Sequence, residues 1–182
     1  MHRSVRRLLG SAATVAVAAS LSLIITDGTS ASVTSSAIPR FTMPKVYGTQ
    51  FQAASHHDFT KGILRSRDDG ILRGWVRSYN RGTAEYTPVR WVGGKQEGDG
   101  FFAGPGKGDV SGYRSPVSSE AVLYSTTDCK IPGAQVTADK RGLGTRRCSK
   151  QELTAHLEAG YRAAMITVHR GRIVKIQEIS TP

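Results

Sequence analysis

The stretch that decides the fold is Ser149–Ile179, SKQELTAHLEAGYRAAMITVHRGRIVKIQEI. It opens with a capping box, in which the Ser149 hydroxyl accepts from the amide three residues on and Glu152 reaches back to the Ser149 amide. Two leucines one turn apart follow, and Gly160 is typical of a helix end. This pattern predicts an amphipathic helix of about three turns.

After Gly160 the hydrophobic period changes from that of a helix to that of a strand. The residues from Ala163 to His169 alternate in the way a strand requires, and a second alternating run follows from Arg172. Between them, Gly171 can adopt positive φ at little cost, which suits a tight turn. The stretch therefore predicts a helix followed by a β-hairpin. A hairpin alone is marginal in water, so the upstream chain must supply further strands.

Strand signals recur upstream of this stretch. Ile71–Tyr79 and Glu85–Val92 alternate as a strand and its return strand, and Pro88 favours an edge position or a bulge. Two shorter candidates are Ala121–Ser125 and Gln135–Ala138. About six short strands and one helix predict a mainly β, α+β domain, arranged as a small, partly open antiparallel β-barrel or roll whose open end the helix covers. The alternative is a single four-stranded sheet with one helix across it.

Residues 1–31 have the composition of a signal peptide. Arginines precede an Ala/Ser-rich apolar run, and Thr29-Ser30-Ala31 offers a small-residue cleavage site. We therefore expect a secreted chain, with residues 32–59 as a flexible N-terminal segment and residues 60–182 as a single β-rich domain. The alternative is an uncleaved N-terminal membrane anchor, because an apolar run of 18 residues lies at the threshold for spanning a bilayer.

The chain is strongly basic, with a formal net charge of +11. Removing residues 1–31 removes three Arg and one Asp, which leaves +9. Such a charge favours anionic partners: a cell-wall anionic polymer, a nucleic acid or an acidic protein. The alternative is a charge that serves solubility alone.

The two cysteines, Cys129 and Cys148, predict one disulfide, because an even count in an exported chain favours pairing. Closing the loop between them stabilises the fold by about 3 kcal/mol in the chain-entropy model. No histidine lies near either cysteine in sequence, so we expect no metal site there and no cofactor.

Two groups of residues are candidate anion-binding sites. The first is one face of the predicted strand, where arginines alternate with aromatics: Arg73, Trp75, Arg77 and Tyr79. Such a face resembles a stacking platform for single-stranded nucleic acid or sugars. The alternative places the aromatics in the core and the arginines at its rim.

The second group lies in and just after the cysteine loop: Lys140, Arg141, Arg146, Arg147 and Lys150. The amides at the start of the helix would add to an anion site there. The alternative is a solvated basic loop. We expect a non-catalytic module rather than an enzyme, and these two groups are its candidate contacts.

A long glycine-rich loop, Gly93–Gly112, supports an alternative function. Loops of this length in a compact domain are functional or mobile, so the protein could be a small secreted inhibitor or enzyme that acts through this loop. The run His56-His57-Asp58 offers metal-ligand side chains, but adjacent histidines seldom bind one ion together, which favours a solvent-exposed loop.

One pattern has the order of a known enzyme class. Arg65, the run Ser125–Thr127, and Gln177 with Glu178 follow the order of the Arg, Ser-Thr-Ser and Gln-x-Glu motifs of secreted ADP-ribosyltransferases. Here the middle run ends in Thr, and Gln177 and Glu178 are adjacent. Adjacent strand residues point to opposite faces, which disfavours this enzyme class.

Four runs resemble a type of small exported β-rich domain found in soil bacteria. They are Gly74–Ser78 (GWVRS), Thr87–Gly94 (TPVRWVGG), Ser115–Val122 (SPVSSEAV) and Val168–Ile179 (VHRGRIVKIQEI). The resemblance covers roughly Ile71–Pro182 and rests on strand starts, a hairpin turn and a loop entry. It implies a small β-rich domain without an assigned activity, and it carries over no functional residue.

Overall fold

The structure is a computed structural model that describes residues 37–52, 64–94, 99–106, 112–131, 136–160 and 162–181. The chain divides into two units, Met1–Ser36 and Ala37–Pro182, and all described residues belong to the second. The predicted signal peptide therefore lies outside the described residues. Across the described ranges, no helix is long and apolar enough to cross a membrane.

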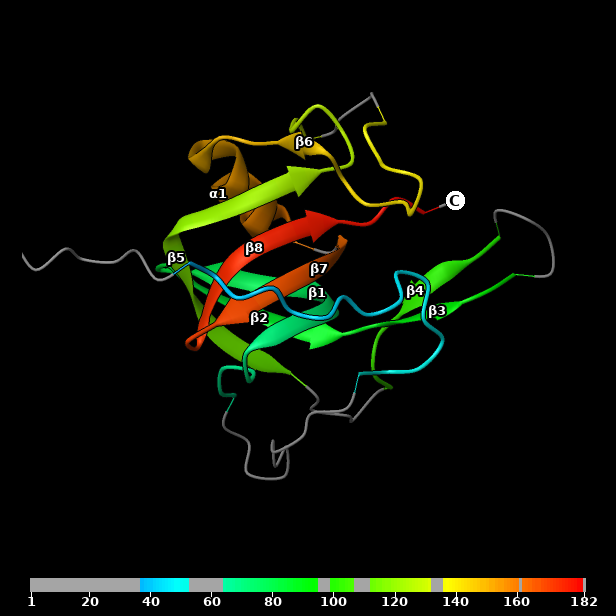
Figure 1. Cartoon of the computed structure of the whole chain (residues 1–182), viewed down its shortest axis with the longest axis horizontal. Helices are drawn as coiled ribbons and strands as arrows, with labels where there is room; N and C mark the ends of the chain where they lie inside the picture. Colours follow the sequence, from blue (N-terminus) through cyan, green and yellow to red (C-terminus); the bar gives the residue numbers. More distant parts are fainter. Residues whose placement is uncertain are drawn as a thin grey trace, which may run out of the picture. The chain divides into compact units, whose positions relative to one another are not determined.

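Five strands form a closed barrel (Figure 1). They are β1 (Gly70–Asn80), β2 (Thr83–Pro88), β5 (Tyr113–Ser125), β7 (Ala163–His169) and β8 (Arg172–Glu178). In the sheet, β1 pairs with β2 and β7, β8 pairs with β7 and β5, and β5 pairs with β2 to close the ring. The β5–β8 pairing is parallel and the other four pairings are antiparallel. The expected small β-barrel is confirmed; it is closed rather than partly open, and mixed rather than antiparallel.

Three strands lie outside this ring. β6 (Arg146–Arg147) continues the sheet beyond β5. β3 (Arg90–Val92) and β4 (Phe101–Ala103) form a separate ribbon, which projects beyond the barrel in Figure 1. The predicted return strand is thus divided into β2 and β3, and the break follows Pro88, which cannot donate to a ladder.

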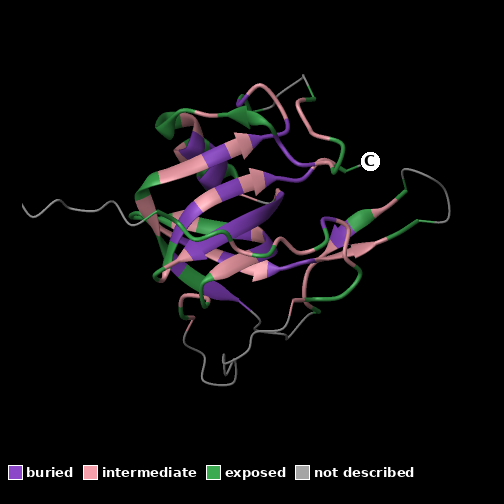
Figure 2. Cartoon of the chain, viewed as in Figure 1, coloured by how far each residue is buried: buried purple, intermediate pink, exposed green. Residues whose placement is uncertain are grey.

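The single helix among the described residues, α1 (Lys150–Ala159), closes one end of the barrel. Both bonds of the predicted capping box are present at Ser149 and Glu152, and Gly160 ends the helix with φ of 62°. Leu153 and Leu157 are buried in the barrel interior. Their partners are Leu72, Val76, Ala84, Tyr86, Tyr113, Leu123, Ala164, Ile166, Val168, Ile173 and Ile176. Figure 2 shows that the barrel strands carry most of the buried residues.

A second cluster, here called the outer cluster, covers the other face of β1 and β7. Its buried members are Val46, Val89, Phe102, Leu143, Ala163, Met165 and Ile179. Residues 37–52 run over this face and contribute Val46, with Met43 and Tyr47 packed around it. Part of the segment expected to be flexible therefore packs against the barrel.

Arg73 fixes this N-terminal segment to the sheet. Its side chain is buried, and its Nε donates to the Val89 carbonyl at 3.0 Å. Its two terminal nitrogens donate to the carbonyls of Lys45 and Gln50. Burial lowers the pKa of Arg73, yet the three carbonyls leave its charge well satisfied. One cation thus binds main-chain carbonyls of the N-terminal segment and of the sheet at the same time.

Candidate functional site

A β-bulge divides the predicted arginine–aromatic face of β1. The register against β2 shifts between Val76 and Ser78, and such a shift re-aims the side chains that follow. Trp75 consequently packs on the outer cluster, whereas Tyr79 packs against the barrel interior. Arg77 is exposed. With Arg73 buried as well, the four side chains do not form one platform, and neither of the sequence-based alternatives describes them all.

The second predicted group is better assembled around an aromatic that the sequence did not indicate. Tyr124 lies on the outer side of β5, with the Lys175 ammonium 5.6 Å from its ring centroid. Arg147 is directly opposite Tyr124 in the β5–β6 ladder, and opposed residues share a face of the sheet. The pKa of Lys175 is lowered by burial and then by the charge of Arg141, which places a third cation beside them.

Lys140 and Arg141 extend this charge to the N-terminal segment. They occupy the tip of a turn that is closed by the Ala138–Gly144 bridge. Between this tip and the N-terminal segment lies an open groove of about 530 Å³, lined by Lys45, Lys140 and Arg141 with Met43, Pro44, Val46 and Tyr47. We call Lys45, Lys140, Arg141, Arg147 and Lys175 the outer basic face. Asp139 pairs with Arg141 at 3.0 Å and offsets one of the positive charges of the outer basic face.

Arg146 and Lys150 belong to a different side of the molecule. Arg146 is opposite Ser125 and next to Arg147, so its side chain projects from the face of β6 opposite to that of Arg147. Lys150 is exposed at the start of α1. The capping box engages two of the amides at the helix start, those of Ser149 and Glu152. Its hydrogen bonds, together with the charge of Arg146, lower the pKa of Glu152.

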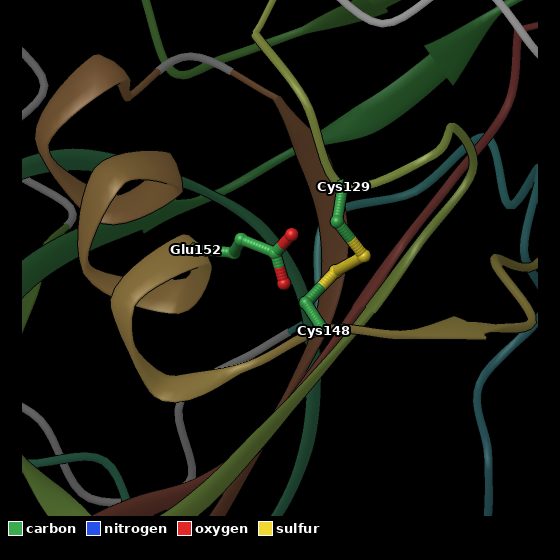
Figure 3. A group of neighbouring side chains, drawn as sticks. All are labelled: Cys129, Cys148 and Glu152. Atoms are coloured by element: carbon green, nitrogen blue, oxygen red, sulfur yellow. A yellow bond between two sulfur atoms is a disulfide. The ribbon is translucent and has the colours of Figure 1, made fainter.

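The predicted disulfide is present between Cys129 and Cys148, with the sulfurs 2.01 Å apart. The Glu152 carboxylate points toward it (Figure 3), and the three side chains bring ligand-type atoms within 4.8 Å of one another. Because the sulfurs are bonded to each other, neither is a thiolate that could bind a metal ion. This cluster is therefore a covalent tie beside a helix cap.

A buried polar network lies where α1 meets the barrel, and it centres on Glu178. Oε2 of Glu178 accepts from the Ser125 hydroxyl at 2.6 Å and from the amide and hydroxyl of Thr126 at 2.9 and 3.2 Å. Oε1 pairs with His156 Nδ1 at 2.8 Å. Nε of Arg162 lies 3.8 Å from the same oxygen. The network joins the ends of β5 and β8 to the middle of α1.

His156 is positively charged in this network. Its Nδ1 faces a carboxylate, and its Nε2 lies 3.1 Å from the Cys129 carbonyl. Both partners accept only, so both ring nitrogens must donate. The hydrogen bond to Glu178 raises the pKa of His156 against the effect of burial. The pKa of Glu178 falls to about 2 although burial opposes this, because His156, Ser125 and Thr126 donate to its charged form.

The Glu178–His156 pair predicts a pH range of maximum stability. The contribution of Glu178 is complete above its ordinary pKa of 4.5 and is lost as the pH falls toward 2. The contribution of His156 is complete below its ordinary pKa of 6.5 and is lost as the pH rises through its higher folded value. We expect the melting temperature, measured by calorimetry, to peak between these values. His156→Gln should remove the decline on the alkaline side, and an unchanged decline would contradict the assignment.

The arrangement of Ser125, His156 and Glu178 is not that of a nucleophilic triad. In a triad the histidine lies between the nucleophile and the acid. Here the acid lies between the two, and His156 Nε2 faces a carbonyl instead of the serine. A carboxyl whose pKa is about 2 is also a poor base near neutrality. The network holds the fold together and orients Arg162.

The structure brings together two of the three parts of the ADP-ribosyltransferase pattern. Glu178 bonds to Ser125 and Thr126, and Gln177 points to the opposite face and donates to the Gly144 carbonyl, as the adjacency predicts. Arg65 lies elsewhere. Its neighbour Ser66 donates to the carbonyl of Gly171, at the far end of β8 from Glu178. Strand β8 separates the two ends by roughly 20 Å, so the third part is missing from this site.

The glycine-rich loop Gly93–Gly112 contains β4, which the sequence did not predict. Phe102 of β4 stacks edge-on against Trp91 and is buried in the outer cluster. Gly100 allows this packing, because a Cβ there would lie 1.8 Å from the Trp91 ring. The remaining stretches of the loop, 95–98 and 107–111, and the run His56-His57-Asp58 lie outside the described residues.

Comparison with known proteins finds no match: no family model, no curated protein and no solved structure is similar to this chain. The functional residues must therefore be argued from this molecule alone. Sequence reasoning missed Lys45, Tyr124, Arg162 and Lys175, because each is isolated in sequence and is brought to its neighbours by the closure of the barrel.

Proposed function

We propose that this protein is an exported, non-catalytic module that binds an anionic polymer along its outer basic face. The observation that supports this is the convergence of cations from four separate parts of the chain, Lys45, Lys140–Arg141, Arg147 and Lys175, on one side of the barrel. The Cys129–Cys148 disulfide is compatible with an extracellular location.

The charges of this face favour a polymer over a single small ion. Lys175 and Arg141 are close enough for one charge to lower the pKa of the other, so a bound anion would relieve their repulsion. Tyr124 lies between Lys175 and Arg147 and offers a ring against which a sugar or base can pack. The groove beside Lys140 continues the path toward Lys45. A chain of repeated anionic groups can occupy these points in succession.

Arg147→Ala tests the face, and Arg146→Ala is its matched control. The two substitutions remove the same charge from adjacent residues on opposite sides of β6. We expect Arg147→Ala to weaken binding to fluorescein-labelled heparin about three- to tenfold and to reduce the slope of log Kd against log salt by about one. Arg146→Ala should change either quantity much less. Both variants should keep the wild-type free energy of unfolding to within about 0.5 kcal/mol.

Equal losses in the two variants would show an effect of net charge alone and would contradict the proposed face. Wild-type binding that is independent of salt would contradict polyanion binding altogether. Parallel titrations with single-stranded DNA and with poly-glutamate identify the polymer class, because a backbone of sugars, bases or peptides differs in what it presents to Tyr124. Arg172 is exposed at the other end of β8, away from the outer basic face. Arg172→Ala should therefore have little effect on heparin binding.

A further inference from the structure

A second cavity lies apart from the outer basic face, at the end of the barrel where β1, β7 and β8 meet the disulfide loop. Its volume is about 500 Å³, within the range of small-molecule sites. Its lining combines aromatic, hydroxyl and charged groups, among them Trp75, Phe102, Thr126, Thr127, Arg162 and Glu178. Such a mixed lining is typical of a site for a small polar ligand rather than of a protein docking groove.

The charge of this cavity is set by three ionised groups. His156 and Glu178 form a buried pair at 2.8 Å, in which the two charges cancel. Arg162 adds a further positive charge, and its nearest carboxylate oxygen is 3.8 Å away, too far for a hydrogen bond. Its side chain is 40% exposed and lines the cavity. The cavity therefore presents one guanidinium whose charge is not consumed by Glu178.

The buried pair also determines where this guanidinium lies. Glu178 is fixed by hydrogen bonds from Ser125 and Thr126 and cannot move toward Arg162. It therefore attracts Arg162 to the cavity wall without engaging its hydrogen-bond donors. A planar guanidinium held in this way is suited to a two-point contact with a carboxylate or phosphate.

An aromatic side chain lines the same cavity as this charge. Trp75 pairs with Ala163, the residue after Arg162, in the β1–β7 ladder, and both Trp75 and Arg162 line the cavity. Trp75 is half-buried and lines the cavity with Phe102. The edge of the Trp75 ring lies against Gly104, where a Cβ would come within 2.8 Å of it. The glycine thus lets the main chain support the ring in one position.

We propose that this cavity binds a small ring-bearing anion, whose carboxylate or phosphate pairs with Arg162 and whose ring packs against Trp75. The hydroxyls of Thr126 and Thr127 already bond to Glu178 and Ser125, and each keeps acceptor capacity for a ligand hydroxyl. An acidic monosaccharide meets all three requirements: charge, ring and hydroxyl donors. This inference is independent of the outer basic face, because the two sites share no lining residue.

Isothermal titration calorimetry with three probes tests the site: D-glucuronate, glucose 6-phosphate and neutral glucose. The first two differ in the kind of anion, so their ranking distinguishes a carboxylate from a phosphate site. We expect saturable binding of at least one anion and at least tenfold weaker binding of glucose. Arg162→Gln should bind the anions at least tenfold more weakly, and Arg162→Lys should lose less affinity. Trp75→Phe should lower the affinity for both anions.

Arg147→Ala should leave this binding unchanged, which separates failure here from failure of polyanion binding. Glucose that binds as tightly as the anions would overturn the role of Arg162. Saturable binding that survives Arg162→Gln would overturn the site, and no heat with either anion would overturn the ligand class. If Arg162→Gln fails to fold, Arg162→Lys and Trp75→Phe decide by the same criteria, and full affinity in both overturns the proposal.

Discussion

Replacing Glu178 by glutamine is expected to lower the free energy of unfolding by about 3–5 kcal/mol, because it leaves the buried His156 imidazolium without its counter-charge. The change keeps the size of the side chain, so packing in the barrel is preserved. The depressed pKa supports the magnitude: a fall from 4.5 to about 2 corresponds to about 3 kcal/mol. Urea denaturation at pH 6 measures the loss directly.

Glu158→Gln is the matched control for this prediction. Glu158 lies on the exposed side of the same helix, and its substitution removes the same charge. We expect its effect to stay within about 0.5 kcal/mol. A loss of less than about 1 kcal/mol in Glu178→Gln would mean that His156 is neutral in the fold, and the pH range of maximum stability would then vanish as well.

Arg73→Met is the second substitution with a large expected effect. Methionine fills the space of the aliphatic part of the side chain but donates no hydrogen bond, so the carbonyls of Lys45, Gln50 and Val89 lose their shared donor. We expect the free energy of unfolding to fall by about 3 kcal/mol. We also expect the part of residues 37–52 around Lys45 to loosen while the barrel remains folded, because two of the three Arg73 hydrogen bonds go to this segment.

Limited trypsin digestion followed by mass spectrometry separates these two effects. Cleavage after Lys45 should accelerate in Arg73→Met at temperatures well below the melting transition, whereas the site after Lys175 in β8 stays protected. Arg172→Met, an exposed arginine on β8, should leave both the cleavage rate and the stability unchanged. Uniform acceleration at all sites would show that Arg73 supports the whole domain rather than one segment.

Local signals in the sequence predict the C-terminal part of the fold well. The capping box at Ser149 and Glu152 and the turn at Gly171 depend on residues close together in the chain, and both are confirmed. The disulfide follows from the number of cysteines and is also confirmed. These features need no knowledge of distant partners, which is why residue types and spacing suffice.

Features that depend on distant partners were not predictable in the same way. The parallel pairing of β5 with β8 joins strands that β6, α1 and β7 separate in sequence, and no residue in either strand encodes its direction. β5 also runs from Tyr113 through Pro116, whereas sequence reasoning began the strand at Ala121. The β1 bulge near Arg77 changes which residues share a face without a glycine to mark it.

The candidate sites show the same contrast between local sequence signals and contacts made by distant residues. The cationic segment around Lys140 and Arg147 was visible as composition, but the partner that gives it shape, Tyr124, lies on another strand. Glu178 is indicated in the sequence by its place in the ADP-ribosyltransferase pattern. The arginine that lines its cavity, Arg162, has no sequence context that would single it out. Site geometry here is a product of closure of the ring.

The position of β8 in the ring has a consequence for folding. Among the strands that the structure describes, β8 comes last in sequence, and it lies between β7 and β5, so the ring cannot close without it. Until β8 pairs with β5, a strand distant in sequence, the sheet stays open and its apolar interior is exposed. Docking of β8 is therefore the step that removes this aggregation-prone surface.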